Sequence, residues 1–472
     1  MKIRSARRAA LATFCVAAMV LAACGDDDDS TSTEPAATEA PSDTAASTAA
    51  PTDTAASTDA PAETTGSSGA EAPDGTDALG EEPSGEATGT PITIGVVYSE
   101  TGRTGAAYQA ADDVANAWAD WVNSEEGGVN GHPITIAAGD SLSTGEGAAA
   151  AGREVVESDG AIAVIINDST AENALTEYLA GQNVPYIGGS ANGRPQDSAA
   201  TQWPNIYFHQ QPSSPTTSAT TMFVAKLDGR ENFGAMVCAE VPVCAEADAL
   251  FSSLGPALGL NYVGLVTVGA ADPSYQAPCL ELIGKDTDAL NLGLAPSTIH
   301  SVIDECSTQG YTGTYTSSYN SVLPSDVESI EGVRMIGGFN GFPWWADDPQ
   351  VQQFRDAMEA SGTTVDYNTP AATSTWSALE LFRKTMNDSG PPADAEVTSQ
   401  DIIDAYHGIT DETLGGLLPQ PITYVADGQQ PLIKCFWPFV IEDGETTSLP
   451  TPDEESGNGA DGDLKTICYD LG

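Results

Sequence analysis

The sequence predicts an α/β protein with two lobes, each built on a parallel sheet that helices cover on both faces. Three observations predict it. Short apolar runs rich in β-branched residues recur along the chain, and stretches with helical periodicity separate many of them. The chain has 472 residues, and the part after position 90, about 380 residues, is large for a single such sheet.

The strands are expected where the apolar runs are short and bounded by turn residues. These runs are 92–97, 134–138, 161–166, 184–187, 234–237, 262–268, 289–294 and 333–339. Helices are expected at 109–123, 147–158, 171–181 and 245–258. In the first of these helices, Val114, Trp118 and Val122 recur at helical spacing. Strands that alternate with helices favour parallel sheets, in which ligands bind beyond the carboxyl ends of the strands.

Residues 1–23 have the pattern of an export signal. A basic start is followed by an apolar run of about 15 residues, which is short for a membrane span. The run ends in Leu21-Ala22-Ala23-Cys24, which resembles a bacterial lipobox, so we expect Cys24 to carry a lipid on the outer side of the cell membrane. An ordinary signal peptide with an incidental cysteine is the alternative. No later stretch approaches 18 uninterrupted apolar residues.

A low-complexity segment follows at 24–90. It consists almost wholly of Ala, Thr, Ser, Pro, Asp, Glu and Gly, and after Cys24 it contains no Lys, Arg or aromatic residue. Such a composition cannot bury enough apolar surface to offset chain entropy, so we expect a disordered acidic linker. Its function is interpreted as a spacer between the membrane and the body, and a linker without a specific role is the alternative.

The charge balance excludes polyanionic partners. Lys and Arg total 16 and Asp and Glu total 68, which gives a net charge of −52. A chain this acidic is repelled by nucleic acid and by anionic membrane surfaces. Solubility and adaptation to salt are both compatible with this charge.

Six cysteines remain after the signal and Cys24 are set aside. An even number of cysteines in an exported chain suggests disulfides, and six cysteines allow 15 different pairings. We expect nearest neighbours to pair, as Cys238–Cys244, Cys279–Cys306 and Cys435–Cys468. Zinc binding is the rival, but there is no Cys-x-x-Cys pair and the four His are far apart in sequence, so no metal or cofactor is expected.

Four segments resemble one known family. They are the opening strand and Thr-Gly loop at 92–102, an Asn-x-x-Gly-Gly-Val-Asn-Gly-like turn at 123–134, and the strand–loop units at 164–174 and 184–192. Through these segments the chain resembles the type I periplasmic binding proteins of the branched-chain amino acid class. Proteins of this class are the extracytoplasmic solute receptors of ABC importers. The likeness is strong over 91–210 and weaker to about 440.

The resemblance implies two Rossmann-like lobes joined by three crossings that close on a ligand as a hinge. Lobe 1 would comprise 91–210 and 340–425, and lobe 2 would comprise 211–339 and 426–472. It also implies a monomer that performs no catalysis and that binds a small solute and the permease subunits of an ABC transporter.

The resemblance places ligand contacts in two loops of lobe 1. Ser169 and Thr170 stand where the family binds its ligand through a hydroxyl, and they also suit a helix N-cap. Ser190, Ala191 and Asn192 match the loop that holds an α-carboxylate and an α-amino group. Asn192 replaces the usual Thr but can still accept from an ammonium group or donate to a carboxylate, and a simple Asn turn is the alternative.

Further candidates are Tyr98, at the end of the first strand, and Tyr319, near the position where amino acid binders place a Glu. The family's Tyr-Gly after the first strand of lobe 2 is replaced near Val243 and Cys244. The missing Glu leaves the partner of a ligand ammonium open. The aromatic residues at 339–345 suit either a pocket wall or core packing.

Together these patterns predict a lipid-anchored binding protein that captures a polar solute, such as a branched-chain amino acid or a related amide, between the lobes. A sensor with the same fold is one alternative. A secreted hydrolase is another, because 188–192 nearly spells a Gly-x-Ser-x-Gly elbow, although its last position is Asn192.

Overall fold

The computed structural model describes residues 87–168, 172–189, 205–210, 214–240, 242–318, 322–426, 431–451 and 456–469. The predicted signal, Cys24 and nearly all of the predicted linker lie outside these residues. None of the described helices is both long and apolar enough to span a bilayer.

The first sheet is parallel, with the strand order β2–β1–β3. Its strands are β1 (Ile92–Tyr98), β2 (Ile134–Asp140) and β3 (Ala163–Asn167). The expected strand at 184–187 is wrong as a full strand, because only Tyr186 forms bridges, to Val164 and Ile206. Pro185 lacks an N–H group, and two glycines follow Ile187, so the segment runs beside β3 with few ladder bonds.

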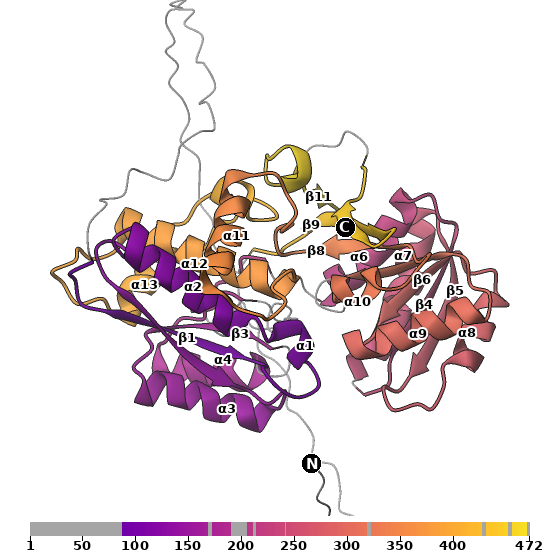
Figure 1. Cartoon of the computed structure of the whole chain (residues 1–472), viewed down its shortest axis with the longest axis horizontal. Helices are drawn as coiled ribbons and strands as arrows, with labels where there is room; N and C mark the ends of the chain where they lie inside the picture. Colours follow the sequence, from indigo (N-terminus) through magenta and orange to yellow (C-terminus); the bar gives the residue numbers. More distant parts are fainter. Residues whose placement is uncertain are drawn as a thin grey trace, which may run out of the picture. The chain divides into compact units, whose positions relative to one another are not determined.

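Helices cover both faces of the first sheet (Figure 1). Strand residues such as Ile94 and Val96 pack against Val114 and Trp118 of α2 (Ala111–Glu125). Residues that alternate with them pack on the other face, against α3 (Gly145–Arg153) and α4 (Glu172–Gln182). The expected helix at 147–158 is α3 followed by a π-helix at Glu154–Ser158, and α1 (Gly105–Tyr108) precedes α2.

The second sheet has eight strands among the described residues, in the order β10–β9–β8–β7–β6–β4–β5 with β11 paired to β9. The strands are β4 (Asn232–Cys238), β5 (Asn261–Val268), β6 (Ala289–Gly293), β7 (Thr314–Ser318), β8 (Met335–Phe339), β9 (Cys435–Glu442), β10 (Glu445–Ser448) and β11 (Ile467–Cys468).

The expectation of wholly parallel sheets is wrong for the second sheet. Strands β4 to β8 are parallel, but β9 is antiparallel to β8, and β10 and β11 are antiparallel to β9. The chain returns to this sheet from a distant segment, so β9 can enter in the opposite direction, and the short turn at Asp443–Gly444 then makes a hairpin with β10.

Helices also cover both faces of the second sheet (Figure 1). Phe233 of β4 packs with Phe251 of α7 (Pro242–Leu258) and Met222 of α6 (Ser214–Leu227). Leu290 and Leu292 of β6 face the opposite way, into the core cluster that includes α8 (Gln276–Ile283) and α9 (Pro296–Thr308). The short α10 (Pro324–Glu328) lies between β7 and β8 in the chain.

After β8 the chain leaves the second sheet and adds helices beside α2. These are α11 (Pro349–Ser361), α12 (Pro370–Ser389) and α13 (Ser399–Tyr406), and both α11 and α12 pack against α2. Short 3₁₀ turns lie at Leu414–Gly416 and Gly462–Leu464. The two-lobe fold is therefore present, while the lobe boundaries given above stay a prediction.

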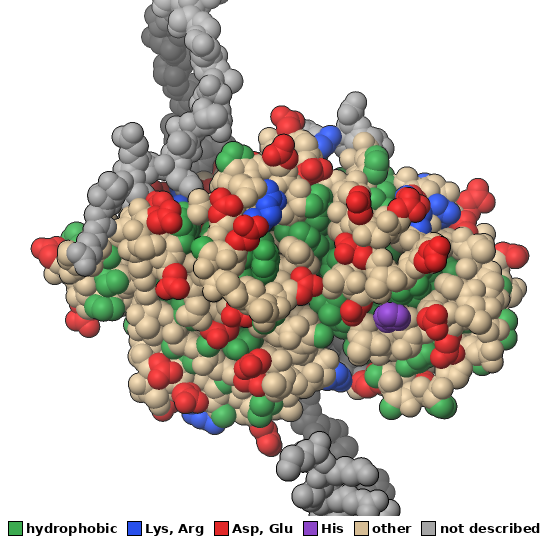
Figure 2. All heavy atoms as spheres, in the orientation of Figure 1, with side chains coloured by type: hydrophobic (Ala, Val, Ile, Leu, Met, Phe, Trp, Pro, Cys, Tyr) green, Lys and Arg blue, Asp and Glu red, His purple; other side chains and the backbone are tan. Residues whose placement is uncertain are grey.

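Three disulfides staple the second sheet and its helices. They are Cys238–Cys244, Cys279–Cys306 and Cys435–Cys468, which is the nearest-neighbour pairing expected from the sequence. The second joins α8 to α9 in the buried core, and the third joins β9 to β11. Figure 2 shows acidic side chains spread over the visible face, with few Lys or Arg among them.

Candidate functional site

The carboxyl ends of β1, β2 and β3 meet at one edge of the first sheet. Tyr98 pairs with Asp140 on one side and with Asn167 on the other, so the three strands end level with one another. The backbone N–H of Ser141 donates to Tyr98 O at 2.7 Å, and that of Ser99 donates to Asn167 O at 3.2 Å. The loops that follow these strands therefore form one continuous polar edge, which we call the strand-end cluster (Tyr98–Thr101, Asp140–Ser143 and Asn167–Asp168).

Tyr98 is the last residue of β1 and is buried. Its hydroxyl donates to Glu100 Oε2 at 3.3 Å. Burial, together with the negative charges of Asp112, Glu100 and Asp140, raises the pKa of Tyr98 well above its usual value. The phenol is therefore protonated at neutral pH, and its single O–H group donates to the Glu100 carboxylate.

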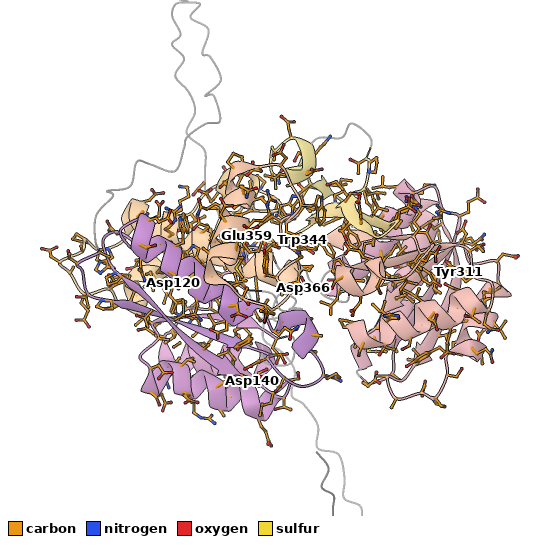
Figure 3. The ribbon with its side chains drawn as sticks, viewed as in Figure 1. Asp120, Asp140, Tyr311, Trp344, Glu359 and Asp366 are labelled. Carbon is orange, nitrogen blue, oxygen red and sulfur yellow. A yellow bond between two sulfur atoms is a disulfide. The ribbon has the colours of Figure 1, made fainter. Side chains whose placement is uncertain are left out.

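Asp140 is the last residue of β2, and Figure 3 labels it at the end of that strand. Its Oδ1 accepts from the backbone N–H groups of Leu142 at 2.8 Å and of Glu100 at 3.1 Å, and its Oδ2 accepts from Thr101 Oγ1 at 2.7 Å. Burial acts to raise the pKa of Asp140, but these hydrogen bonds outweigh it and lower the pKa. Asp140 therefore ties the first two loops together as a carboxylate.

Three hydroxyl groups hold the same two loops from the other side. Ser99 Oγ and Ser143 Oγ lie 2.5 Å apart, and Thr104 Oγ1 lies 3.0 Å from the first and 2.9 Å from the second. Ser143 Oγ also donates to Thr101 O and accepts from the backbone N–H of Thr104. The loop after β2 is thereby fixed to the loop after β1.

Asp168 brings a second carboxylate to this edge from the end of β3. It is fully buried, and Ser141 Oγ donates to its Oδ2. A buried carboxylate is costly unless hydrogen bonds or an opposite charge stabilise it. Asp168 also precedes Ser169 directly, so the described chain reaches the predicted ligand loop at this cluster.

The Gly188–Gly189 turn lies at the same edge, because Ile166 N–H donates to Gly188 O at 3.1 Å. Both glycines have positive φ, and a Cβ on Gly189 would lie 2.3 Å from Ile166 O. Ser374 Oγ of α12 donates to Gly189 O at 2.8 Å. This turn leads directly to Ser190, and only glycine fits it.

His209 supports that turn from behind. Its Nε2 lies 3.1 Å from Ser374 O and 3.2 Å from Ser377 Oγ, and a Cβ on Gly188 would lie 2.4 Å from its Nδ1. Complete burial lowers the pKa of His209 to about 4. The imidazole is therefore neutral at physiological pH, and within the described residues its Nδ1 has no hydrogen-bond partner.

Most residues predicted to touch a ligand lie outside the described residues. This holds for Ser169, Thr170, Ser190, Ala191, Asn192 and Tyr319. Tyr98 is described and lies in the strand-end cluster. Asp168 and Gly189, which directly precede Ser169 and Ser190 in the chain, both lie at this edge. The roles of the six residues above as ligand contacts remain a prediction.

The second sheet contributes fewer polar groups. Tyr315 is buried inside β7, where its hydroxyl lies 3.2 Å from Ser307 Oγ, so it is a core residue. Cys244, which stands near the family's Tyr-Gly position, is bonded to Cys238 at the end of β4. Among the described residues, no group of three or more His, Cys, Asp or Glu is arranged to hold a metal ion.

The aromatic residues at 339–345 pack into the core. Phe339 stacks on Phe439 with ring centroids 4.0 Å apart, and Phe342 meets Phe354 edge-on. Trp344, which Figure 3 labels, is buried, and its ring centroid lies 5.5 Å from that of Phe339. Of the two roles that suited this segment, the structure shows packing between the second sheet and α11.

A family model described as "Periplasmic binding protein" matches residues 91–446. The chain belongs to this family. Its members are substrate-binding proteins of a non-catalytic class, and this chain is a periplasmic binding protein. A comparison with curated protein sequences gave no match.

Solved structures of periplasmic binding proteins share the fold. A leucine-binding protein from Thermotoga maritima is 16% identical with a TM-score of 0.59, over 77% of this chain and 99% of that one. A fatty acid ABC transporter substrate-binding protein from Thermomonospora curvata is 14% identical with a TM-score of 0.62, over 78% and 93%. A solute-binding protein from Rhodopseudomonas palustris BisB5, in complex with 3,4-dihydroxybenzoic acid, is 14% identical with a TM-score of 0.58, over 75% and 95%.

In this periplasmic binding protein the strand-end cluster contains hydroxyl groups and carboxylates that bond to one another and to the loop backbones. Sequence reasoning missed Asp140, Ser141, Ser143 and Asp168 as members of the cluster. The signal was available, because short polar runs follow β2 and β3 directly.

Proposed function

We propose that this protein captures a small polar solute, an amino acid of the branched-chain type or a related amide, between its two lobes for an ABC importer. The observation that carries the proposal is the strand-end cluster. The protonated Tyr98 would exchange its hydrogen bond to Glu100 for one to a ligand oxygen, while Asp140 supplies negative charge near a ligand ammonium. Both lie at the edge that leads to Ser169 and Ser190.

The negative charge of lobe 1 is relevant because lobe 2 lacks the family's Glu at the position nearest Tyr319. An ammonium group buried without a partner is costly. Carboxylates at the ends of β2 and β3 could compensate for it. This supports an amino acid or amide over the fatty acid or the dihydroxybenzoic acid named for two of the similar structures.

Calorimetric titration of the exported chain tests the ligand class. L-leucine, L-valine and leucinamide are compared with octanoate and 3,4-dihydroxybenzoate. We expect saturable binding of at least one compound that carries an amino or ammonium group. Binding of only octanoate or 3,4-dihydroxybenzoate would contradict the proposed ligand class. Hydrolysis of leucinamide during the titration would contradict a non-catalytic role.

The ligand loop is tested with Ser169→Ala, compared with Ser253→Ala as the matched control. Ser253 lies on the exposed side of α7, and its hydroxyl bonds only to Leu250 O among the described residues. We expect Ser169→Ala to weaken the best ligand about tenfold, the value of one hydrogen bond to a charged group, with Tm unchanged. Equal affinities in both variants would remove Ser169 from the site.

We also propose that Cys24 is lipid-modified and tethers the protein to the outer side of the cell membrane through the 24–90 linker. The support is the Leu21-Ala22-Ala23-Cys24 pattern at the end of an export signal. Cys24→Ala should move the protein from the membrane fraction to the soluble fraction, whereas Cys15→Ala should not. Retention of the Cys24→Ala protein on the membrane would contradict the anchor.

A further inference from the structure

The loop after β2 contains two successive non-glycine residues in the left-handed region. Leu142 has φ of 56° and Ser143 has φ of 53°, and they are the only such adjacent pair among the described residues. Most other non-glycine residues with positive φ are Asn or Asp, which tolerate this conformation. Leucine does not, since its Cβ crowds the backbone.

The surrounding contacts impose this conformation. The backbone N–H of Leu142 donates to Asp140 Oδ1, and the Ser143 hydroxyl contacts the hydroxyls of Ser99 and Thr104. A strained backbone persists where its surroundings over-determine it, and such strain concentrates at functional sites. These hydrogen bonds hold the backbone of Leu142 in the left-handed conformation.

The left-handed conformation does not bury Leu142. Its side chain is 55% exposed, the largest value among the exposed large hydrophobic residues in the described part of the chain. The other left-handed leucine, Leu414, is buried. A lone exposed leucine is ordinary, but an exposed leucine in a strained conformation has no evident folding role, since Asn or Gly would adopt this backbone at lower cost.

The position of Leu142 suggests what it contacts. It lies two residues beyond β2, at the same edge as Tyr98 and Asp168, where its neighbours Asp140, Ser141 and Ser143 are all polar. We infer that Leu142 contacts an apolar part of the bound solute. The ligand class is therefore a solute with one polar or charged end and one aliphatic or aromatic part. The inference rests on the proposed function in that it uses the same site.

Two homologous ligand series test this inference in the exported chain. One is alanine, 2-aminobutyrate, norvaline and norleucine, and the other is propionate, butyrate, pentanoate and hexanoate. Each is titrated into the wild type, Leu142→Asn and Leu432→Asn. Leu432 is the matched control because it is an exposed leucine (43%) of a loop outside the strand-end cluster.

We expect the wild-type Kd to fall with chain length, by up to about fourfold per methylene group. Leu142→Asn should reduce the affinity ratio between the longest and shortest ligand about fivefold, with an unchanged or higher Tm because Asn relieves the backbone. Leu432→Asn should leave the ratio unchanged. A smaller affinity ratio between long and short ligands in Leu142→Asn, together with a retained Tm, shows that Leu142 contacts the ligand and does not only support the fold.

The two ligand series separate this inference from the proposed function. If only the carboxylates bind, the amino acid proposal fails, while the chain-length ratio in that series still decides the role of Leu142. An unchanged ratio in Leu142→Asn overturns the inference, even if amino acids bind. A wild type that binds neither series overturns both.

Discussion

At the residue scale, burial and hydrogen bonds fix the protonation states of the strand-end cluster. Burial, reinforced by nearby carboxylates, keeps Tyr98 protonated. The hydrogen bonds to Asp140 keep it ionised despite partial burial. Over the whole physiological pH range this edge therefore carries a protonated phenol and a fixed negative charge.

His209 predicts how stability depends on pH. Its pKa is about 4 in the folded protein, against an ordinary value of 6.5, so the unfolded chain binds a proton first as the pH falls. The stability associated with neutral His209 is complete above about pH 6.5 and is lost between about 6.5 and 4, at up to about 1.4 kcal/mol per pH unit.

Urea unfolding of the wild type and of His209→Gln between pH 7 and pH 4.5 measures this effect. Gln cannot titrate in this range, so the pH dependence should be shallower in the variant. His300→Gln is the control, because His300 is exposed on α9, and it should keep the wild-type slope. Parallel curves for the wild type and His209→Gln would contradict the role given to His209.

At the scale of elements, a buried ion pair within α12 contacts two tryptophans of α2. Arg383 Nη2 lies 2.9 Å from Glu380 Oε2, and Trp118 Nε1 donates to Glu380 Oε1 at 2.6 Å. The guanidinium also lies 5.3 Å from the ring centroid of Trp121 and 3.5 Å from Glu126. Both partners of the pair are almost fully buried, so each compensates for the desolvation of the other.

Arg383→Met should lower the free energy of unfolding by about 3–5 kcal/mol, because it leaves the Glu380 carboxylate buried without its counter-ion. Lys384→Met is the control one residue along α12. Lys384 is half-exposed and pairs with Asp388 and Glu412, so its loss should cost about 0–1 kcal/mol. Urea denaturation measures both values, and equal costs would contradict the importance of burial.

The Gly188–Gly189 turn supports a second prediction at this scale. Gly189→Ala should weaken ligand binding and lower Tm, because a Cβ there meets Ile166 O in a backbone conformation that alanine rarely adopts. Gly181→Ala in α4, where a Cβ meets nothing within 4 Å, should instead raise stability by about 0.5–1 kcal/mol. Calorimetric titration measures the ligand affinity of both variants, and thermal unfolding measures their Tm. A Gly189→Ala protein with wild-type Tm and affinity would contradict the requirement for glycine at this turn.

The elements that sequence predicts well here are those with strong periodicity. The apolar run of β1 and the spacing of Val114, Trp118 and Val122 on α2 identify them from local pattern alone. No strand was expected at Thr314–Ser318, whose side chains are mostly polar, and this segment forms β7 because it pairs with β6 and β8. β9 contains Pro438, which disfavours a strand locally.

At the scale of the whole molecule, the net charge of −52 implies self-repulsion in the compact state. Raising NaCl from about 10 mM to 500 mM shortens the Debye length from about 30 Å to below 8 Å and should raise Tm. Thermal scans in NaCl and KCl measure this, and the two salts should agree because screening depends on ionic strength. A Tm that falls with both salts would contradict net repulsion.

The roles of Tyr98, Ser169 and Ser190 as ligand contacts stay predictions. The rule that ligands bind beyond the carboxyl ends of parallel strands directed the search to the loops after those strands, and the family resemblance selected the residues. The rule cannot say which loop residues meet across strands. The contact of Ser99 with Ser143 joins positions far apart in the chain, and so does the support of Gly189 by Ser374.

The sequence by itself determined the class of fold, the export pattern, the acidic character and the six cysteines, because each follows from composition or from local periodicity. Only the tertiary structure decided that β9 runs antiparallel to β8, that the aromatics at 339–345 pack as core, and that Leu142 is held exposed in a left-handed conformation. The physical reason is that these features depend on contacts between segments distant in the chain, and local propensity carries no record of such contacts.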